Sequence, residues 1–130
     1  MIVDTSALIA LIQSEAASDA IGAALANTPR RAISAATLLE ASIVADGTHD
    51  PVRSARFDAL IEALELEVVP VTDDQVRIAR QAFRDYGRGS GHPARLNYGD
   101  CFSYALARQR REPLLFVGDH FTHTDVASVL

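Results

Sequence analysis

Two aspartates follow short apolar segments near the two ends of the chain. Asp4 comes directly after Ile2-Val3, and Asp119 comes after residues 115–117 with only Gly118 between them. If both segments are parallel strands of one sheet, the two carboxylates stand at the same sheet edge, where such sheets bind their ligands. Carboxylate oxygens gathered in this way are suited to bind Mg²⁺ or Mn²⁺.

Two further acids are placed to complete such a cluster. Asp100 lies in the first turn of a predicted helix, where the helix dipole favours an anion. Glu40 lies among small and apolar neighbours on a predicted helix over 35–45, and a charge on such a face needs a partner. A divalent cation held by these two acids together with Asp4 and Asp119 would be that partner. Because the chain has no set of histidines and cysteines at ligand spacing, zinc is disfavoured.

Each acid also has a simpler explanation when it is taken alone. Asp4 could cap the helix that follows it, and Asp100 could be an ordinary charge in a first helical turn. Glu40 could pair with an arginine, and Asp119 could be a turn residue. Their joint placement at one sheet edge is what favours a metal site over these four separate explanations.

Several other chemistries are excluded by what the chain lacks. All 12 basic residues are arginine, whereas phospho-receiver domains and haloacid-dehalogenase phosphatases each need a lysine near the phosphate. No GxxxxGK[ST] loop is present for a P-loop nucleotide site, and no GxSxG elbow positions a serine nucleophile. The glycine-rich stretch 87–91 follows a predicted helix rather than a strand, which excludes a dinucleotide site. The single cysteine, Cys101, permits no intrachain disulfide.

The elements that must position the acids alternate between strand and helix. This alternation predicts a single α/β domain over residues 1–130, a three-layer sandwich with a mostly parallel sheet of about four to five strands flanked by helices. No apolar run approaches the ~20 residues of a membrane span, and no signal peptide is recognisable, so we expect a cytoplasmic protein without a membrane partner. The predicted strands are 1–3, 31–34, 66–71 and 114–117, and the predicted helices are 6–13, 16–26, 35–45, a segment after Pro51, 73–86, 100–110 and a last turn from about Thr124.

Charge is unevenly distributed along this acidic chain. The net charge of −5 by itself argues against a nucleic-acid partner. However, residues 40–74 contain nine acids and two arginines, whereas residues 77–111 contain eight arginines and two acids. Arginines three or four residues apart form a stripe that leads toward Asp100, which indicates either a phosphate track for RNA or a solvated helix face. The residues of this candidate track are Arg77, Arg80, Arg84, Arg88 and Arg95.

Four segments of the chain resemble the PIN domains of VapC-type toxins. They occur in the order of that family and span almost the whole chain. The resemblance implies a PIN-like fold and a metal-dependent endoribonuclease, using Mg²⁺ or Mn²⁺, that is the toxin of a type II toxin–antitoxin system. The matching segments are DTSALIA from Asp4, TLLE ending at Glu40, LNYGDCFSYALA containing Asp100, and LLFVGDHF containing Asp119.

The resemblance also assigns roles to individual residues. The four acids become the catalytic set, with Asp4 and Asp100 binding the metal and Glu40 and Asp119 completing its ligand shell directly or through water. The hydroxyls that follow the first acid, Thr5 and Ser6, would steady it. Members of the family often carry an acid where this chain has His120, so the fourth position of the site is either Asp119 or His120.

Partners follow from the same resemblance. It implies a cognate VapB-type antitoxin, an RNA substrate, a homodimer and a larger toxin–antitoxin assembly, and the antitoxin could inhibit by placing an arginine among the acids. Apolar residues of the helices before Asp73 could form these interfaces or belong to the core. The alternatives are a PIN-fold nuclease that acts in RNA processing or on DNA, and a non-catalytic PIN module that only binds protein.

Overall fold

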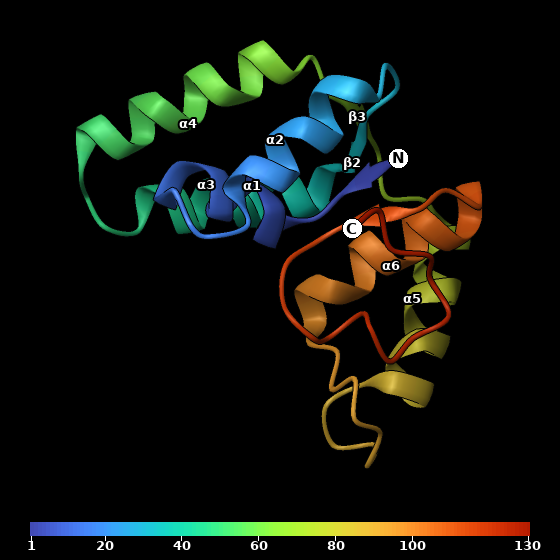
Figure 1. The fold of residues 1–130 in the computed structure, drawn as a ribbon. Coiled ribbons are helices and arrows are strands. Elements are labelled where there is room, and N and C mark those ends of the chain that lie inside the picture. Colours follow the sequence, from blue (N-terminus) through green and yellow to red (C-terminus); the bar gives the residue numbers. More distant parts are fainter.

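The structure, a computed structural model, describes all 130 residues. Its centre is a four-stranded parallel sheet in the order β3-β2-β1-β4, which confirms the predicted α/β class. Figure 1 shows α1 to α4 grouped together, with α5 and α6 on the opposite side of the strands. The strands are β1 (Ile2–Val3), β2 (Ala32–Ser34), β3 (Glu67–Val69) and β4 (Leu114–Leu115), and the helices are α1 (Thr5–Gln13), α2 (Ser18–Asn27), α3 (Ala35–Asp46), α4 (Pro51–Leu64), α5 (Asp73–Tyr86) and α6 (Tyr98–Arg110).

The sheet separates two hydrophobic cores. Successive residues of a strand point to opposite faces, so Ile2 packs into the core on the α5–α6 side while Val3 packs into the core on the α1–α4 side. Leu114 and Leu115 divide in the same way between the two cores. This is why the central strands are continuous apolar segments rather than alternating ones.

The apolar helices differ in how much of their surface is buried. Leu8 of α1 and Leu64 of α4 belong to the α1–α4 core, which accounts for much of the excess apolar surface before Asp73. In α5, by contrast, Val76 and Phe83 are exposed and line a groove against α6.

None of the helices alone has the length and apolar composition of a membrane span. By length and composition, only α1 and α2 taken together reach that range, and they are bent by 120° relative to each other.

The C-terminal tail does not form the helical turn predicted from about Thr124, and that prediction is wrong. The tail instead runs beside β4, where the Leu114 N–H donates to the Ala127 carbonyl at 2.8 Å and the Val129 N–H donates to the Leu114 carbonyl at 3.0 Å. β4 is an edge strand with unpaired backbone groups, and the tail satisfies them. The Tyr104 hydroxyl anchors the tail by donating to Asp125 Oδ1 at 2.6 Å.

Candidate active site

Asp4 lies at the carboxyl end of β1 and is the N-cap of α1. Its Oδ2 accepts hydrogen bonds from the Ser6 backbone N–H at 3.0 Å and from Ser6 Oγ at 2.6 Å. Its Oδ1 accepts one from Ser103 Oγ at 2.6 Å. The aspartate is only 4% exposed, and these three hydrogen bonds hold its buried carboxylate in one orientation. Capping the helix and lining a site are therefore compatible roles for this residue.

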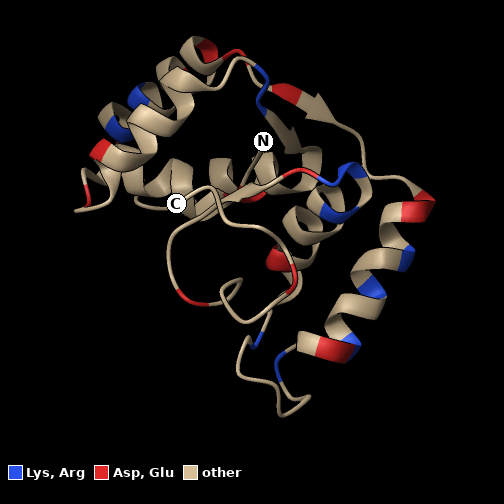
Figure 2. Ribbon diagram, turned by 45° about the vertical axis from the view of Figure 1, so that its right-hand side comes forward, with Lys and Arg blue, Asp and Glu red and all other residues tan.

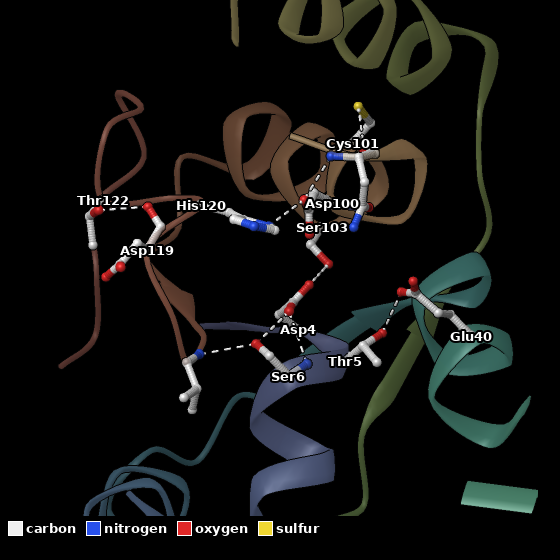
Figure 3. A network of polar contacts seen from close by, with 12 residues as sticks. Asp4, Thr5, Ser6, Glu40, Asp100, Cys101, Ser103, Asp119, His120 and Thr122 are labelled. Atoms are coloured by element: carbon white, nitrogen blue, oxygen red, sulfur yellow. Dashed lines mark hydrogen bonds and ion pairs between the residues drawn. The ribbon is translucent and has the colours of Figure 1, made fainter. Parts of the chain in front are cut away.

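Ser6 and Ser103 connect Asp4 to distant parts of the chain (Figure 3). Ser6 Oγ also accepts from the Val117 N–H at 3.0 Å, which ties α1 to the segment after β4. Ser103 lies 3.1 Å from Thr37 Oγ1, and both hydroxyl groups are fully buried. Thr37 and Ser103 were not predicted from the sequence. Ser103 could have been recognised because it lies three residues after Asp100 and therefore on the same helix face.

Glu40 reaches the same region from α3. Thr5 Oγ1 donates to Glu40 Oε2 at 2.7 Å and is also 3.2 Å from the Thr37 carbonyl. Thr5 was expected to steady Asp4, but the structure places its hydroxyl against Glu40 instead. Burial raises the pKa of Glu40, the negative charges of Asp4 and Asp100 raise it further, and the Thr5 hydrogen bond opposes them.

Asp100 is fixed at the start of α6 by a capping box. Asn97 Oδ1 accepts from the Asp100 N–H at 2.9 Å, and Asp100 Oδ2 accepts from the Asn97 N–H at 2.8 Å. The same Oδ2 lies 2.9 Å from His120 Nδ1. Burial raises the pKa of Asp100, as does the charge of Asp4, while the contacts with Asn97 and His120 lower it.

Three of the four predicted acids line a single cleft of about 280 Å³. Asp4, Glu40 and Asp100 come from β1, α3 and α6, and His120 stands beside them. Asp119 does not line this cleft. It is exposed, its carbonyl accepts from Thr122 Oγ1 at 2.7 Å, and its carboxylate points away from the other acids in Figure 3.

The donor set of this cleft fits a hard divalent cation. No three His, Cys, Asp or Glu side chains are already close enough to grip an ion together, but Mg²⁺ is usually bound by one or two carboxylates and keeps several waters. Asp100 Oδ1 and Glu40 Oε1 accept no hydrogen bond from the protein. Burial raises the pKa values of both acids, and so does the negative charge of Asp4, with Asp100 adding to the effect on Glu40. A bound cation would relieve this repulsion.

The predicted arginine track is only partly free to bind phosphate. Arg77 is paired with Asp73 and, at 3.3 Å, with Asp74. Arg80 and Arg84 form no ion pair and line the groove between α5 and α6, and Figure 2 shows basic residues along α5 and in the loop after it. Arg88 and Arg95, in that loop, are also exposed and unpaired. The track stays a prediction, which the salt dependence of RNA binding would test.

Comparisons with known proteins agree with the resemblance of the sequence. The PIN domain family model matches residues 1–127. The chain is 56% identical over 130 residues to Ribonuclease VapC28 of Mycobacterium tuberculosis, covering 100% of this chain and 98% of that protein. Two solved structures from the same organism share the fold. VapC20, a toxin that cleaves the sarcin-ricin loop, has a TM-score of 0.74 at 19% identity and covers 97% of this chain and 95% of its own.

The second solved structure is VapBC-5, a member of the VapBC family of toxin–antitoxin systems. It has a TM-score of 0.66 at 27% identity, and the match covers 98% of this chain and 92% of that chain. The family model and the 56% identical relative each extend over almost the full length of the chain. The chain therefore belongs to the PIN-domain VapC ribonucleases, the toxins of toxin–antitoxin systems.

Proposed function

We propose that this VapC ribonuclease hydrolyses RNA phosphodiester bonds with Mg²⁺ bound in the cleft of Asp4, Glu40 and Asp100. The observation that supports the proposal is the convergence of three acids from separate elements on one cleft. Two of them have pKa values raised by burial and by the neighbouring negative charges. An unneutralised acidic cleft would repel RNA, and a bound cation reverses the sign of the local field.

The residues of the cleft divide the work of hydrolysis between them. When bound, Mg²⁺ would acidify a water molecule and polarise the phosphodiester. Asp4 and Asp100, each held by several hydrogen bonds, would bind the ion without having to reorganise. Glu40, whose Oε2 accepts a hydrogen bond from Thr5, would orient the attacking water with its free oxygen. In-line attack by that water would leave a 3′-hydroxyl and a 5′-phosphate.

Mg²⁺ is expected to switch cleavage on and to stabilise the folded protein. A cation that binds only the folded state stabilises it by about 1.4 kcal/mol at ten times its Kd, which raises the Tm of a domain of this size by a few degrees. EDTA-treated protein is titrated with MgCl₂ while cleavage of a labelled RNA and thermal unfolding are measured. NaCl at matched ionic strength is the control. Cleavage that persists in EDTA, or a Tm that Mg²⁺ does not move, would contradict the proposal.

The stabilisation by Mg²⁺ should also depend on pH. The pKa values of Glu40 and Asp100 are raised in the folded state. Protonation of these two acids therefore contributes to stability at pH values below their unfolded-state pKa values. This contribution is lost as the pH rises through their folded-state pKa values. The metal-free protein should therefore lose stability over that range. The increase in Tm on adding Mg²⁺ should grow over the same range.

A second copy of the chain is the partner we propose for the exposed face of α3. The similarity to VapBC-5, a member of a toxin–antitoxin family, supports an antitoxin as a further partner. The face consists of Leu39, Ile43 and Val44 with Tyr98 beside them, and Tyr98 is 79% exposed. Exposed apolar patches mark protein interfaces. Because this patch carries no charge apart from Glu40 at its border, two copies can meet face to face in a two-fold dimer without charge repulsion.

Replacing Ile43 with glutamate is expected to convert the dimer to a monomer. Ile43 is 61% exposed, so the change places charges at the proposed interface without disturbing either core. Light scattering after size-exclusion chromatography measures the mass. The matched control is Val52→Glu, at a residue of α4 that is 66% exposed and lies outside this face. A monomeric wild-type protein, or a variant that remains dimeric, would contradict the proposed dimer.

A further inference from the structure

His120 is the one histidine that lines the cleft of the three acids. We propose that it is a positioning residue that fixes the carboxylate of Asp100, and that it takes the fourth position of the site in place of Asp119. This inference rests on the proposed Mg²⁺ site and concerns what prepares one of its ligands.

Asp100 Oδ2 has two hydrogen-bond partners at once. The Asn97 N–H donates to it at 2.8 Å, and His120 Nδ1 lies 2.9 Å away. An ionised carboxylate can only accept hydrogen bonds, so Nδ1 carries the proton of this contact. Two donors on one oxygen prevent the carboxylate from rotating and leave its Oδ1 without a protein partner. Asp100 thereby offers the cation one fixed oxygen, in an orientation set by α6 on one side and by residue 120 on the other.

The chain directs His120, and not Asp119, into the site. Gly118 has a φ of +97°, a conformation that glycine adopts readily, and it turns the chain after β4. Phe121 is buried and its ring centroid lies 5.1 Å from that of Phe116, which anchors the segment next to His120. Asp119 points away from the acids in Figure 3, with its carbonyl bonded to Thr122.

With a histidine instead of an acid at position 120, the site has one negative charge fewer. The cleft holds three carboxylates instead of four, and the affinity of a divalent cation depends on the number of charged ligands and on their rigidity. His120 supplies rigidity through its contact with Asp100 without adding a negative charge. Loss of a hydrogen-bond partner of a metal ligand typically lowers metal affinity by about 10–100-fold.

The test measures Mn²⁺ affinity directly, by electron paramagnetic resonance of the free ion, in a set of variants at His120. His120→Ala and His120→Gln are expected to weaken Mn²⁺ binding by about tenfold. His120→Asn places an amide N–H where Nδ1 stood and should remain within about twofold of the wild type, whereas glutamine places its amide nearer the position of Nε2. The matched control is His123→Ala, an exposed histidine three residues away. Thermal unfolding establishes that each variant is folded.

The outcomes separate this inference from the metal site on which it depends. If Asp4→Asn and Asp100→Asn leave Mn²⁺ affinity unchanged, the proposed metal site is wrong. If those variants lose affinity but His120→Ala binds as the wild type does, only the role of His120 is overturned. The role of His120 is also overturned if His120→Asn binds Mn²⁺ no more tightly than His120→Gln. The same holds if Asp119→Asn loses as much Mn²⁺ affinity as His120→Ala. The role of His120 is supported if the alanine and glutamine variants lose Mn²⁺ affinity and the asparagine variant keeps it.

Discussion

Replacing Asp100 with asparagine is expected to reduce RNA cleavage by at least about 100-fold, the upper end of what is lost when only a hydrogen-bond partner of a metal ligand is removed. Asparagine keeps an oxygen that accepts from the Asn97 N–H and from His120 Nδ1, at the present distances of 2.8 Å and 2.9 Å. What it removes is the negative charge and the second carboxylate oxygen. The variant therefore removes a ligand of the cation while the capping of α6 by this residue is kept. A loss of cleavage can then be assigned to the cation and not to the start of the helix.

The same variant should be at least as stable as the wild type when metal is absent. Burial and the charge of Asp4 raise the pKa of Asp100, so the ionised form weakens folding. The wild type loses stability as pH rises through the folded pKa of this group, and the asparagine variant does not, so the difference in Tm should increase with pH. Mg²⁺ should raise the Tm of the wild type more than that of the variant.

Cleavage of a labelled RNA in Mg²⁺ and thermal melts between acidic and neutral pH test both parts of this expectation. The matched control is Asp58→Asn, which removes an exposed carboxylate on α4 far along the chain from the site. An Asp100→Asn variant that retains full activity would contradict the metal mechanism. A variant that unfolds well below the wild type in EDTA would show that the charge supports the fold rather than opposing it.

The sheet and the acids of the cleft could be predicted because each depends on local sequence. Central strands of a parallel sheet are continuous apolar segments, and Asp4 follows one of them directly. Asp100 and Glu40 could be recognised because a first helical turn favours an anion and an apolar helix face does not. These rules need only the neighbours of a residue along the chain, and the structure brings all three acids to one cleft.

The remaining features depend on contacts between distant segments. The buried pair of Thr37 and Ser103 exists only because α3 and α6 pack together behind Asp4. His120 rather than Asp119 lines the cleft, and the chain reaches it through the turn at Gly118. The C-terminal tail likewise has no helix because pairing with the edge of β4 satisfies its backbone. The order of residues along a short segment does not indicate which distant segments will pack or pair with it.

Replacing Gly99 with alanine is expected to lower cleavage by about tenfold without lowering stability. A Cβ at this position would overlap the carboxylate of Glu40, with its Cδ only 2.7 Å away. Gly99 lies inside α6 and does not have a positive φ, so the helix itself accepts alanine, which is about 1 kcal/mol more favourable than glycine in a helix. The flexible end of Glu40 must therefore move, and its 2.7 Å hydrogen bond from Thr5 is lost.

A comparison with Gly22→Ala isolates the effect on Glu40. Gly22 lies within α2 and has no atom within 4 Å of an added Cβ, so this variant gains the same helix propensity without touching the site. Both variants should melt at or above the wild-type temperature, and only Gly99→Ala should lose activity. Adding Glu40→Asp to Gly99→Ala shortens the acid and removes the overlap, so the double variant should recover part of the lost rate if a carboxylate at this place orients the attacking water. Wild-type activity in Gly99→Ala would instead mean that the position of the Glu40 carboxylate does not matter for cleavage.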